Sequence, residues 1–257
     1  VVLDAHFRAH PATAEELGDA REGRVADAKP SPEPGTVRST LKNVKNRHKS
    51  KAAVIEYSKR APECATAPAS MVAARWKLPA WEARTKVVDL VARHDVVLVA
   101  GETGCGKSTQ VPQFLLDAKL CAPQDGRRLC VTQPRRVAVL TVSERVAAER
   151  GVDIGGEVGY AMRFERKASK KTAAVFATDG LVVREMLGDE QLQRYGVLIV
   201  DEAHERSVHT DVLLGLAKRT QSKRPLKLIL MSATLDIASL QNYFEDCAVV
   251  KVPGRLH

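Results

Sequence analysis

A chain of 257 residues has room for one large domain, or for a medium-sized domain with a tail. Because hydrophobic residues make up 44% and aromatic residues only 4%, the core must be mostly aliphatic, which favours an α/β fold over an aromatic-rich β-sandwich. The formal net charge of +9 suggests a polyanionic partner, although charge alone does not identify one.

The cysteines and the hydropathy pattern indicate the compartment. The five cysteines are odd in number and form no CxxC pair, so neither a disulfide framework nor a zinc site is indicated. A reducing, intracellular compartment fits best. We expect no membrane association, because no apolar run approaches the length of a membrane span and no signal-peptide pattern opens the chain. Since the first residue is Val1 rather than Met, we expect a fragment or a processed chain.

The first 75 residues lack the apolar periodicity of a folded domain. Residues 1–37 mix Ala, Gly, Pro and charged residues, and residues 29–35 have the composition of an extended linker, so we predict disorder there. Residues 38–60 carry eight Lys or Arg and a single acid, Glu56. This basic segment fits two interpretations equally well: a helix that binds an anionic partner, or a solvated tail that serves as a localisation signal.

From Trp76 onward, short apolar runs alternate with amphipathic stretches. Strands are predicted at residues 96–100, 129–132, 158–161, 174–178, 197–200, 227–231 and 249–252. Helices are predicted between most of them, for example at residues 135–150 and 208–221. Nearly continuous aliphatic strands separated by helices predict an α/β fold with a mainly parallel sheet, flanked by helices on both faces.

The first predicted strand leads into a phosphate-binding pattern. Residues 101–108 read Gly-Glu-Thr-Gly-Cys-Gly-Lys-Ser and match GxxxxGK[ST]. The pattern lies between the strand at 96–100 and a helical stretch at 109–118, which is the context that phosphate loops require. The sequence therefore predicts a P-loop nucleotide-binding site.

Each residue type in this loop suits phosphate binding. Gly104 and Gly106 allow the backbone to curl so that successive N–H groups point at phosphate oxygens. Lys107 supplies a positive charge to the terminal phosphates, and Ser108 offers a hydroxyl to Mg²⁺. The start of the following helix adds a partial positive charge. We interpret Cys105 as a small filler rather than a redox switch.

Two acids follow a later buried strand. Residues 197–204 read Val-Leu-Ile-Val-Asp-Glu-Ala-His, which places Asp201 and Glu202 at the strand end. An acid in this position holds Mg²⁺ in P-loop enzymes, often through water. Two adjacent acids permit a division of roles, with Asp201 on the metal and Glu202 as the base for an attacking water.

At this point the chain resembles the DEAH-box helicases of superfamily 2. Residues 201–206, Asp-Glu-Ala-His-Glu-Arg, are similar to motif II of that family. Four further matches occur: residues 132–136 resemble motif Ia, 178–180 motif Ib, 232–234 motif III, and 252–255 the end of the first RecA domain. The resemblance implies that residues 76–257 form a RecA-like P-loop NTPase domain, preceded by a largely disordered basic region over residues 1–75.

The resemblance also implies which residues bind the nucleotide. The loop residues Gly101, Glu102, Thr103, Gly104, Cys105, Gly106, Lys107, Ser108 and Thr109 would contact the phosphates and the metal. Arg145 would stack on the base, while an exposed helix cation without that role is an equal alternative. Ser232 and Thr234 would couple the nucleotide to the RNA face, and His204 would bridge toward a second domain. His204 and His209 also suggest a metal pair, but no further ligand cluster supports it.

Family resemblance places Arg135, Arg136 and Thr178 on the RNA backbone. Arg135 and Arg136 lie in one segment and Thr178 lies in another. Each segment begins at a strand end, where the next helix offers N–H groups and cations to phosphate. Such contacts carry no base information, so we predict RNA binding that tolerates any sequence and weakens with salt.

Residues 159–164 resemble a hook-like turn that lies near RNA in this family, with Arg163 as a further contact. Tyr160 and Phe164 have rings able to stack on bases. For both, we favour packing in the core.

The base of the nucleotide is predicted to be read weakly. DEAD-box relatives recognise adenine with a Gln upstream of the phosphate loop, and residues 76–100 contain no Gln. We expect ATP and Mg²⁺ as the cofactors. Because the adenine-reading Gln is absent, we expect other nucleoside triphosphates to be accepted as well.

The resemblance implies an ATP-dependent RNA helicase that hydrolyses NTP to move along RNA and remodel it. The second RecA domain and the accessory domains are expected to lie outside this chain, so the isolated chain is predicted to bind nucleotide weakly and to hydrolyse it very slowly. A glycine-rich-patch activator protein would dock on those other domains. We expect a monomer, in the nucleus rather than the cytoplasm. Two alternatives remain: another P-loop ATPase such as a DNA helicase, and a non-catalytic RNA-binding scaffold.

Overall fold

A computed structural model describes residues 68–120, 127–233 and 237–254, all within one unit of the chain, Ser39–His257. The predictions for residues 1–67, including the linker and the basic segment 38–60, lie outside the described residues. No helix in the described ranges is both long and apolar enough to cross a membrane.

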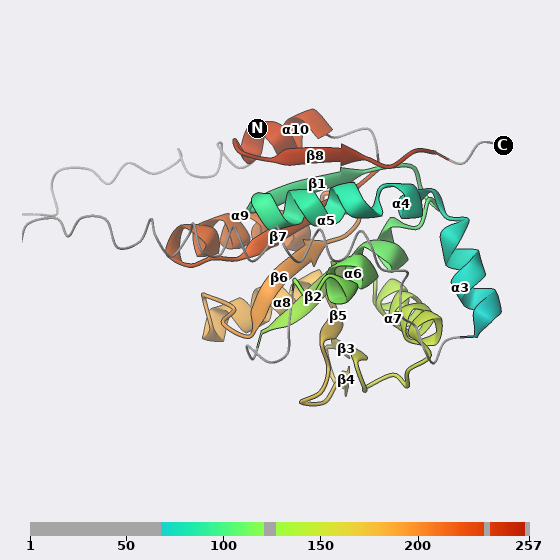
Figure 1. The fold of residues 1–257 in the computed structure, drawn as a ribbon. Coiled ribbons are helices and arrows are strands. Elements are labelled where there is room, and N and C mark those ends of the chain that lie inside the picture. Colours follow the sequence, from blue (N-terminus) through green and yellow to red (C-terminus); the bar gives the residue numbers. More distant parts are fainter. Residues whose placement is uncertain (1–67, 121–126, 234–236, 255–257) are drawn as a thin grey trace, which may run out of the picture. The chain divides into compact units, whose positions relative to one another are not determined.

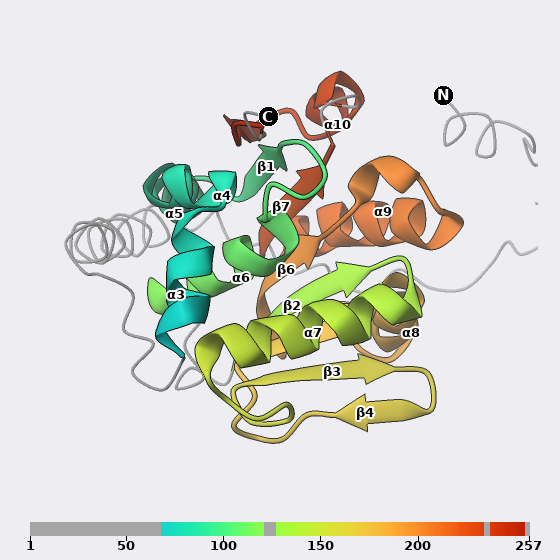
Figure 2. The ribbon, with the colours of Figure 1, turned by 90° about the vertical axis from the view of Figure 1, so that its right-hand side faces the viewer.

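A single mainly parallel sheet occupies the centre of this unit, with strand order β4-β3-β5-β2-β6-β7-β1-β8 (Figures 1 and 2). The strands are β1 Val96–Ala100, β2 Arg128–Gln133, β3 Val158–Met162, β4 Glu165–Lys167, β5 Ala174–Thr178, β6 Tyr195–Val200, β7 Lys227–Ser232 and β8 Ala248–Lys251. Every neighbouring pair is parallel except β3 and β4. The predicted α/β architecture is confirmed, and each predicted strand is present with ends shifted by two residues at most.

Helices cover both faces of the sheet, as the aliphatic strands require. The helices are α3 Ala69–Trp76, α4 Pro79–Glu82, α5 Arg84–Arg93, α6 Lys107–Asp117, α7 Arg136–Arg150, α8 Asp179–Gly188, α9 Val208–Lys223 and α10 Ile237–Tyr243, with a short 3₁₀ turn, η2, at Ala203–Glu205. Helices α5, α6 and α7 pack on one face, and α8, α9 and α10 on the other. In β1, Val97 and Val99 belong to the first core, while Val96 and Leu98 belong to the second. This alternation follows from the two-residue repeat of a strand.

Strand β4 was missed because its sequence carries no apolar signal. It pairs antiparallel with β3 at the edge of the sheet, and all three of its residues, Glu-Arg-Lys, are exposed. The turn between the two strands includes Phe164, whose φ of 67° lies in the left-handed region. Charged residues on a short edge strand also protect the sheet from pairing with another chain.

The folded domain begins earlier than predicted. Helix α3 starts at Ala69, before the expected boundary at Trp76, so the assignment of residues 69–75 to a disordered extension is wrong. The helix was not predicted because the side chain that it buries is charged: Arg75 is only 1% exposed. A buried arginine leaves no apolar pattern from which a helix in the core could be recognised.

Parallel strands place the loops that follow them together at the carboxyl ends of the strands. From here on, the edge of the sheet means this carboxyl edge and not the outermost strand β4. Strand β1 is followed by the phosphate loop and α6, β6 by the two acids, and β2 by α7. In open α/β sheets, ligands bind outside the carboxyl ends of the strands. The predicted site residues therefore converge at this edge.

Candidate nucleotide-binding site

The phosphate loop joins β1 to α6 and needs glycine at defined points. Gly104 and Gly106 have φ values of 81° and 96°, in the left-handed region that other residues avoid. Gly106 is the N-cap of α6, so the helix begins at Lys107. At Gly101 a Cβ atom would lie 2.9 Å from Cβ of Val252, which leaves no space for a side chain. The loop is therefore fixed in shape by its own glycines and by the chain after β8.

The side chain of Lys107 lies within the curve of the loop. Its ammonium donates hydrogen bonds to the carbonyl oxygens of Gly101 at 2.6 Å and Glu102 at 2.9 Å. It also donates a hydrogen bond to Sγ of the buried Cys105 at 3.7 Å, and Cys105 packs as the expected small filler. These three partners use all three N–H donors of the ammonium, so a phosphate oxygen placed over the loop would replace one of them.

Asp201 lies beside the phosphate loop. Its carboxylate is 1% exposed and accepts hydrogen bonds from the Gln133 side chain and from the backbone N–H of Glu202. Burial raises the pKa of Asp201 to about 6, the nearby Ser108 hydroxyl opposes that rise, and the charge of Glu202 adds to it. The two predicted metal ligands, Ser108 and Asp201, thus lie near each other.

This pair suits a divalent cation. Hydroxyl and carboxylate oxygens are the ligands that Mg²⁺ prefers. A buried carboxylate whose charge is disfavoured would be stabilised by a cation beside it. In the described ranges, no group of three or more His, Cys, Asp or Glu side chains is arranged to hold a metal ion, so His204 and His209 form no such site.

Glu202 and His204 are held against the end of β7. Glu202 has a φ of 51°, a strained conformation for a residue other than glycine. Nδ1 of His204 lies 3.4 Å from Oε2 of Glu202 and accepts a hydrogen bond from the backbone N–H of Ala233 at 3.2 Å. The histidine therefore links the acid pair to the segment after β7.

Ser232 ends β7 and is fully buried. Its carbonyl oxygen accepts a hydrogen bond from the N–H of Gly101 at 3.1 Å, so the segment after β7 is connected to the start of the phosphate loop. Its hydroxyl donates to the carbonyl of Ala233. Thr234, predicted to act with Ser232, lies outside the described residues.

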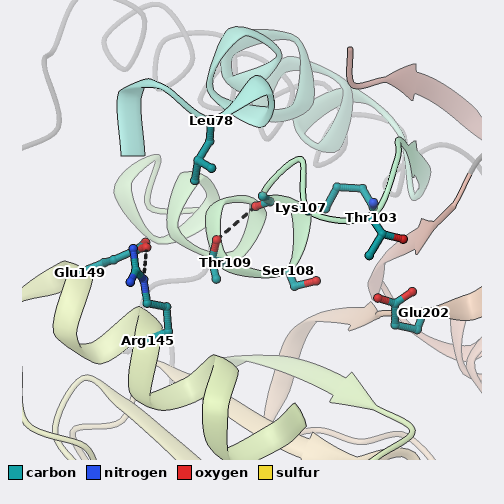
Figure 3. A pocket seen from close by; sticks show the side chains of 10 residues that line it. Leu78, Thr103, Lys107, Ser108, Thr109, Arg145, Glu149 and Glu202 are labelled. Atoms are coloured by element: carbon teal, nitrogen blue, oxygen red, sulfur yellow. Dashed lines mark hydrogen bonds and ion pairs between the residues drawn. The ribbon is translucent and has the colours of Figure 1, made fainter. Parts of the chain in front are cut away.

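A pocket of about 270 Å³ lies over the loop (Figure 3). It is lined by Leu78, Thr103, Gly104, Gly106, Lys107, Ser108, Thr109, Arg145, Glu149 and Glu202. In Figure 3, Arg145 and Glu149 lie at one end and Glu202 at the other, with Lys107 and Ser108 between them. The pocket thus runs from the acid pair, across the start of α6, to α7.

Most predicted nucleotide contacts line this pocket, with three exceptions. Gly101, Glu102 and Cys105 belong to the loop without lining the cavity. The prediction missed Leu78 and Glu149. Glu149 follows Arg145 by one helical turn, a spacing at which charged side chains meet, so the sequence did carry a signal for this pair. Leu78 left no signal, because only the fold places it there.

The predicted RNA-contacting residues gather on the other half of the same edge. Gln133 at the end of β2 is in register with Thr178 at the end of β5, and Arg135 and Arg136 follow directly. Arg136 donates a hydrogen bond to the carbonyl of Arg163 in the β3–β4 turn, at 3.1 Å. The four predicted residues therefore share one edge, at the ends of β2, β5 and β3. Arg135 itself forms an ion pair with Glu205 after the acid pair, at 3.0 Å.

The two aromatic residues near this edge have different positions. Tyr160 is 9% exposed and donates a hydrogen bond to Glu165, so its predicted place in the core is confirmed. The prediction that Phe164 packs in the core is wrong, since its side chain is 92% exposed at the tip of the β3–β4 turn. The Arg163 guanidinium lies 4.7 Å from the centre of its ring. A residue at a turn tip has no second layer to pack against.

Comparison with known proteins identifies the family. The family model of the DEAD/DEAH box helicases matches residues 81–243, which include the phosphate loop and the acid pair. The chain therefore belongs to the DEAD/DEAH box helicase family. Among similar proteins is the probable ATP-dependent RNA helicase DHX35 homolog of Caenorhabditis elegans, which is 44% identical over 194 residues. The alignment covers 71% of this chain and 26% of that relative, so the chain spans about a quarter of the relative's length.

Proposed function

We propose that this chain is the ATP-binding RecA-like domain of an ATP-dependent RNA helicase, and that it binds Mg²⁺ and ATP in the pocket over the phosphate loop. The observation that carries the proposal is the pocket itself, which is lined by Lys107 and Ser108 of the phosphate loop and by Glu202 of the acid pair. The pocket thus brings a phosphate-binding loop and the acids that follow β6 to one point.

The residues of the pocket would divide the work of binding. Loop N–H groups and the start of α6 would hold the phosphates, with Lys107 on the terminal ones. Ser108 and Asp201 would hold Mg²⁺, which when bound neutralises charge on the phosphate oxygens. Glu202, which lines the pocket, would orient and deprotonate the attacking water.

RNA would bind along the half of the edge formed by β2, β5 and β3. Arg135, Arg136, Arg163 and Thr178 are gathered there, and their side chains suit phosphate and sugar oxygens. Asp201 connects the two halves, because its carboxylate accepts a hydrogen bond from Gln133, which precedes the two arginines. The site of hydrolysis and the path of RNA would thus meet at the ends of two neighbouring strands, β2 and β6.

Substitution of Lys107 tests the proposed binding site. In this chain, Lys107→Ala should weaken ADP binding at least tenfold, because a charge-assisted contact of about 1.5–3 kcal/mol to phosphate is lost. Calorimetric titration with Mg²⁺ and ADP measures the effect. Lys86→Ala is the matched control, since Lys86 is exposed on α5 and does not line the pocket. Equal affinities of both variants and the wild type would contradict the proposal.

We expect the isolated chain to hydrolyse ATP very slowly. In this class of motor, further cationic groups from a second domain neutralise charge in the transition state. Two other functions remain as alternatives: a DNA-directed P-loop motor and an RNA-binding scaffold without catalysis. Comparing RNA with DNA as activators of ATP hydrolysis in a longer protein that contains this chain would separate them.

A further inference from the structure

The wall of the nucleotide pocket contains a buried carboxylate, Glu149. It is 1% exposed on α7, and each of its oxygens accepts at least one hydrogen bond. Oε2 accepts from the side-chain amides of Gln110 and Gln113, both at 2.8 Å. Oε1 accepts from Nε of Arg145 at 2.7 Å. Burial of a carboxylate is costly without such partners, so the arrangement is specific rather than incidental.

Glu149 is also tied to the N-terminal helix α3. Nε of Arg75 donates a hydrogen bond to Oε1 of Gln110 at 2.9 Å and lies 3.8 Å from Oε2 of Glu149. Arg75 is itself 1% exposed. Its charge partly offsets that of the carboxylate, as a buried ionic group requires. Four side chains from α3, α6 and α7 thus fix the position of Glu149.

Arg145, whose guanidinium pairs with Glu149, faces the pocket. It is 51% exposed and lines the cavity together with Leu78 and Thr109. Figure 3 places it at the opposite end from Glu202, beyond Lys107. If the phosphates occupy the loop and their reacting end faces Glu202, the nucleoside lies at the Arg145 end. A long side chain that is already ordered loses less entropy when it contacts a ligand.

We propose that Glu149 is a positioning residue, which holds the Arg145 guanidinium at the nucleoside end of the pocket and is itself held by Arg75 of α3. Helix α3 thereby supports the nucleotide site through Arg75, without lining the pocket. This inference rests on the proposed function, since it assumes that a nucleotide occupies the pocket.

The test is a double-mutant cycle on ADP binding, measured by calorimetry with the whole 257-residue chain and Mg²⁺. Arg145→Ala and Glu149→Gln should each weaken ADP binding roughly twofold to thirtyfold, the range expected for loss of a cation–π contact. The double variant should bind ADP no more weakly than Arg145→Ala alone, because Glu149 acts only through Arg145. Glu144→Gln is the matched control, because Glu144 is an exposed carboxylate on the same helix that does not line the pocket.

Pyrophosphate separates positioning from general damage to the fold. It occupies the loop but has no nucleoside, so its affinity should be the same in all variants. Arg75→Lys provides a milder disturbance of the cluster if Glu149→Gln does not fold. It should likewise weaken ADP binding and leave pyrophosphate binding unchanged.

Three results would overturn the inference. A further loss of ADP affinity when Glu149→Gln is added to Arg145→Ala would mean that Glu149 touches the ligand itself or acts on the fold. Equal losses for ADP and pyrophosphate would show a structural role only. A wild-type chain that binds neither ligand would refute the proposed function, and the inference with it. In the first two results the wild-type chain still binds ADP, so the proposed function survives.

Discussion

At residue 201 a carboxylate is held almost out of contact with water. Burial raises the pKa of Asp201 to about 6, even though the Gln133 amide and the Glu202 backbone N–H donate hydrogen bonds to it. A residue selected only for stability would not keep a charge in such a place. The buried charge of Asp201 therefore lowers the stability of the fold, and a bound cation would compensate that charge.

The cost at Asp201 should depend on pH. Because its folded pKa lies above the ordinary value of 3.8, the folded state binds more protons than the unfolded state between pH 4 and 6. Stability is therefore lost as pH rises through this window, by up to about 3 kcal/mol. Asp201→Asn removes the titration, so its stability relative to the wild type should improve by about 1–3 kcal/mol between pH 4 and pH 7.

Urea unfolding in EDTA at both pH values measures this difference. Asp246→Asn serves as the control, since Asp246 is an exposed acid that lies between α10 and β8. Parallel stability–pH curves for Asp201→Asn and the wild type would show that burial does not shift this carboxyl as described.

Among the elements, the β3–β4 hairpin is the one whose exposed tip invites a function. Its turn carries Arg163 and an almost fully exposed Phe164, next to Arg136 at the start of α7. A cation and an aromatic ring side by side match the backbone and base surfaces of single-stranded RNA. Exposed aromatic rings gain little stability in water, so a binding role explains this one better than packing.

Two substitutions should separate these contributions to RNA binding. Phe164→Ala should weaken binding of an oligo-U strand by about 1–3 kcal/mol without changing its salt dependence, because base stacking is lost. Arg136→Ala should reduce the slope of log affinity against log salt by about 0.7, because one phosphate contact is lost.

Fluorescence anisotropy at several salt concentrations measures both effects. Leu187→Ala is the control for Phe164, because Leu187 is exposed near the far end of α8. If Phe164→Ala binds RNA as tightly as the wild type, the turn tip has no stacking role.

The sequence was informative for some elements and silent for others. The strands buried on both faces were predicted because their apolar runs are unambiguous, and the phosphate loop because its glycines have no other use. Strand β4 was not, because its three exposed charged residues carry no apolar signal. Helix α3 was not, since its buried Arg75 has partners far along the chain. The same holds for the link from Arg75 to Glu149, which joins residues of α3 and α7. Periodicity within a segment does not reveal such long-range contacts.

For the whole molecule, the lining of the pocket predicts little discrimination between bases. At the proposed nucleoside end, Leu78 offers an apolar wall and Arg145 a flat cation, neither of which distinguishes one base by its hydrogen-bonding edge. In a longer protein that contains this chain, the four nucleoside triphosphates should therefore be hydrolysed with kcat/KM values within roughly tenfold of one another. Parallel steady-state assays measure this, and a strong preference for ATP would contradict it.

The hydrogen bond between Gln133 and Asp201 would couple the binding of a cation to the binding of RNA at the neighbouring strand end. A cation that binds Asp201 and displaces the Gln133 amide would shift the segment that leads to Arg135 and Arg136, the proposed RNA-binding arginines. By thermodynamic reciprocity, RNA binding that shifts the same amide would change the affinity for the cation by the same factor by which the cation changes the affinity for RNA. Two ligands that never touch would then sense each other through a single amide side chain.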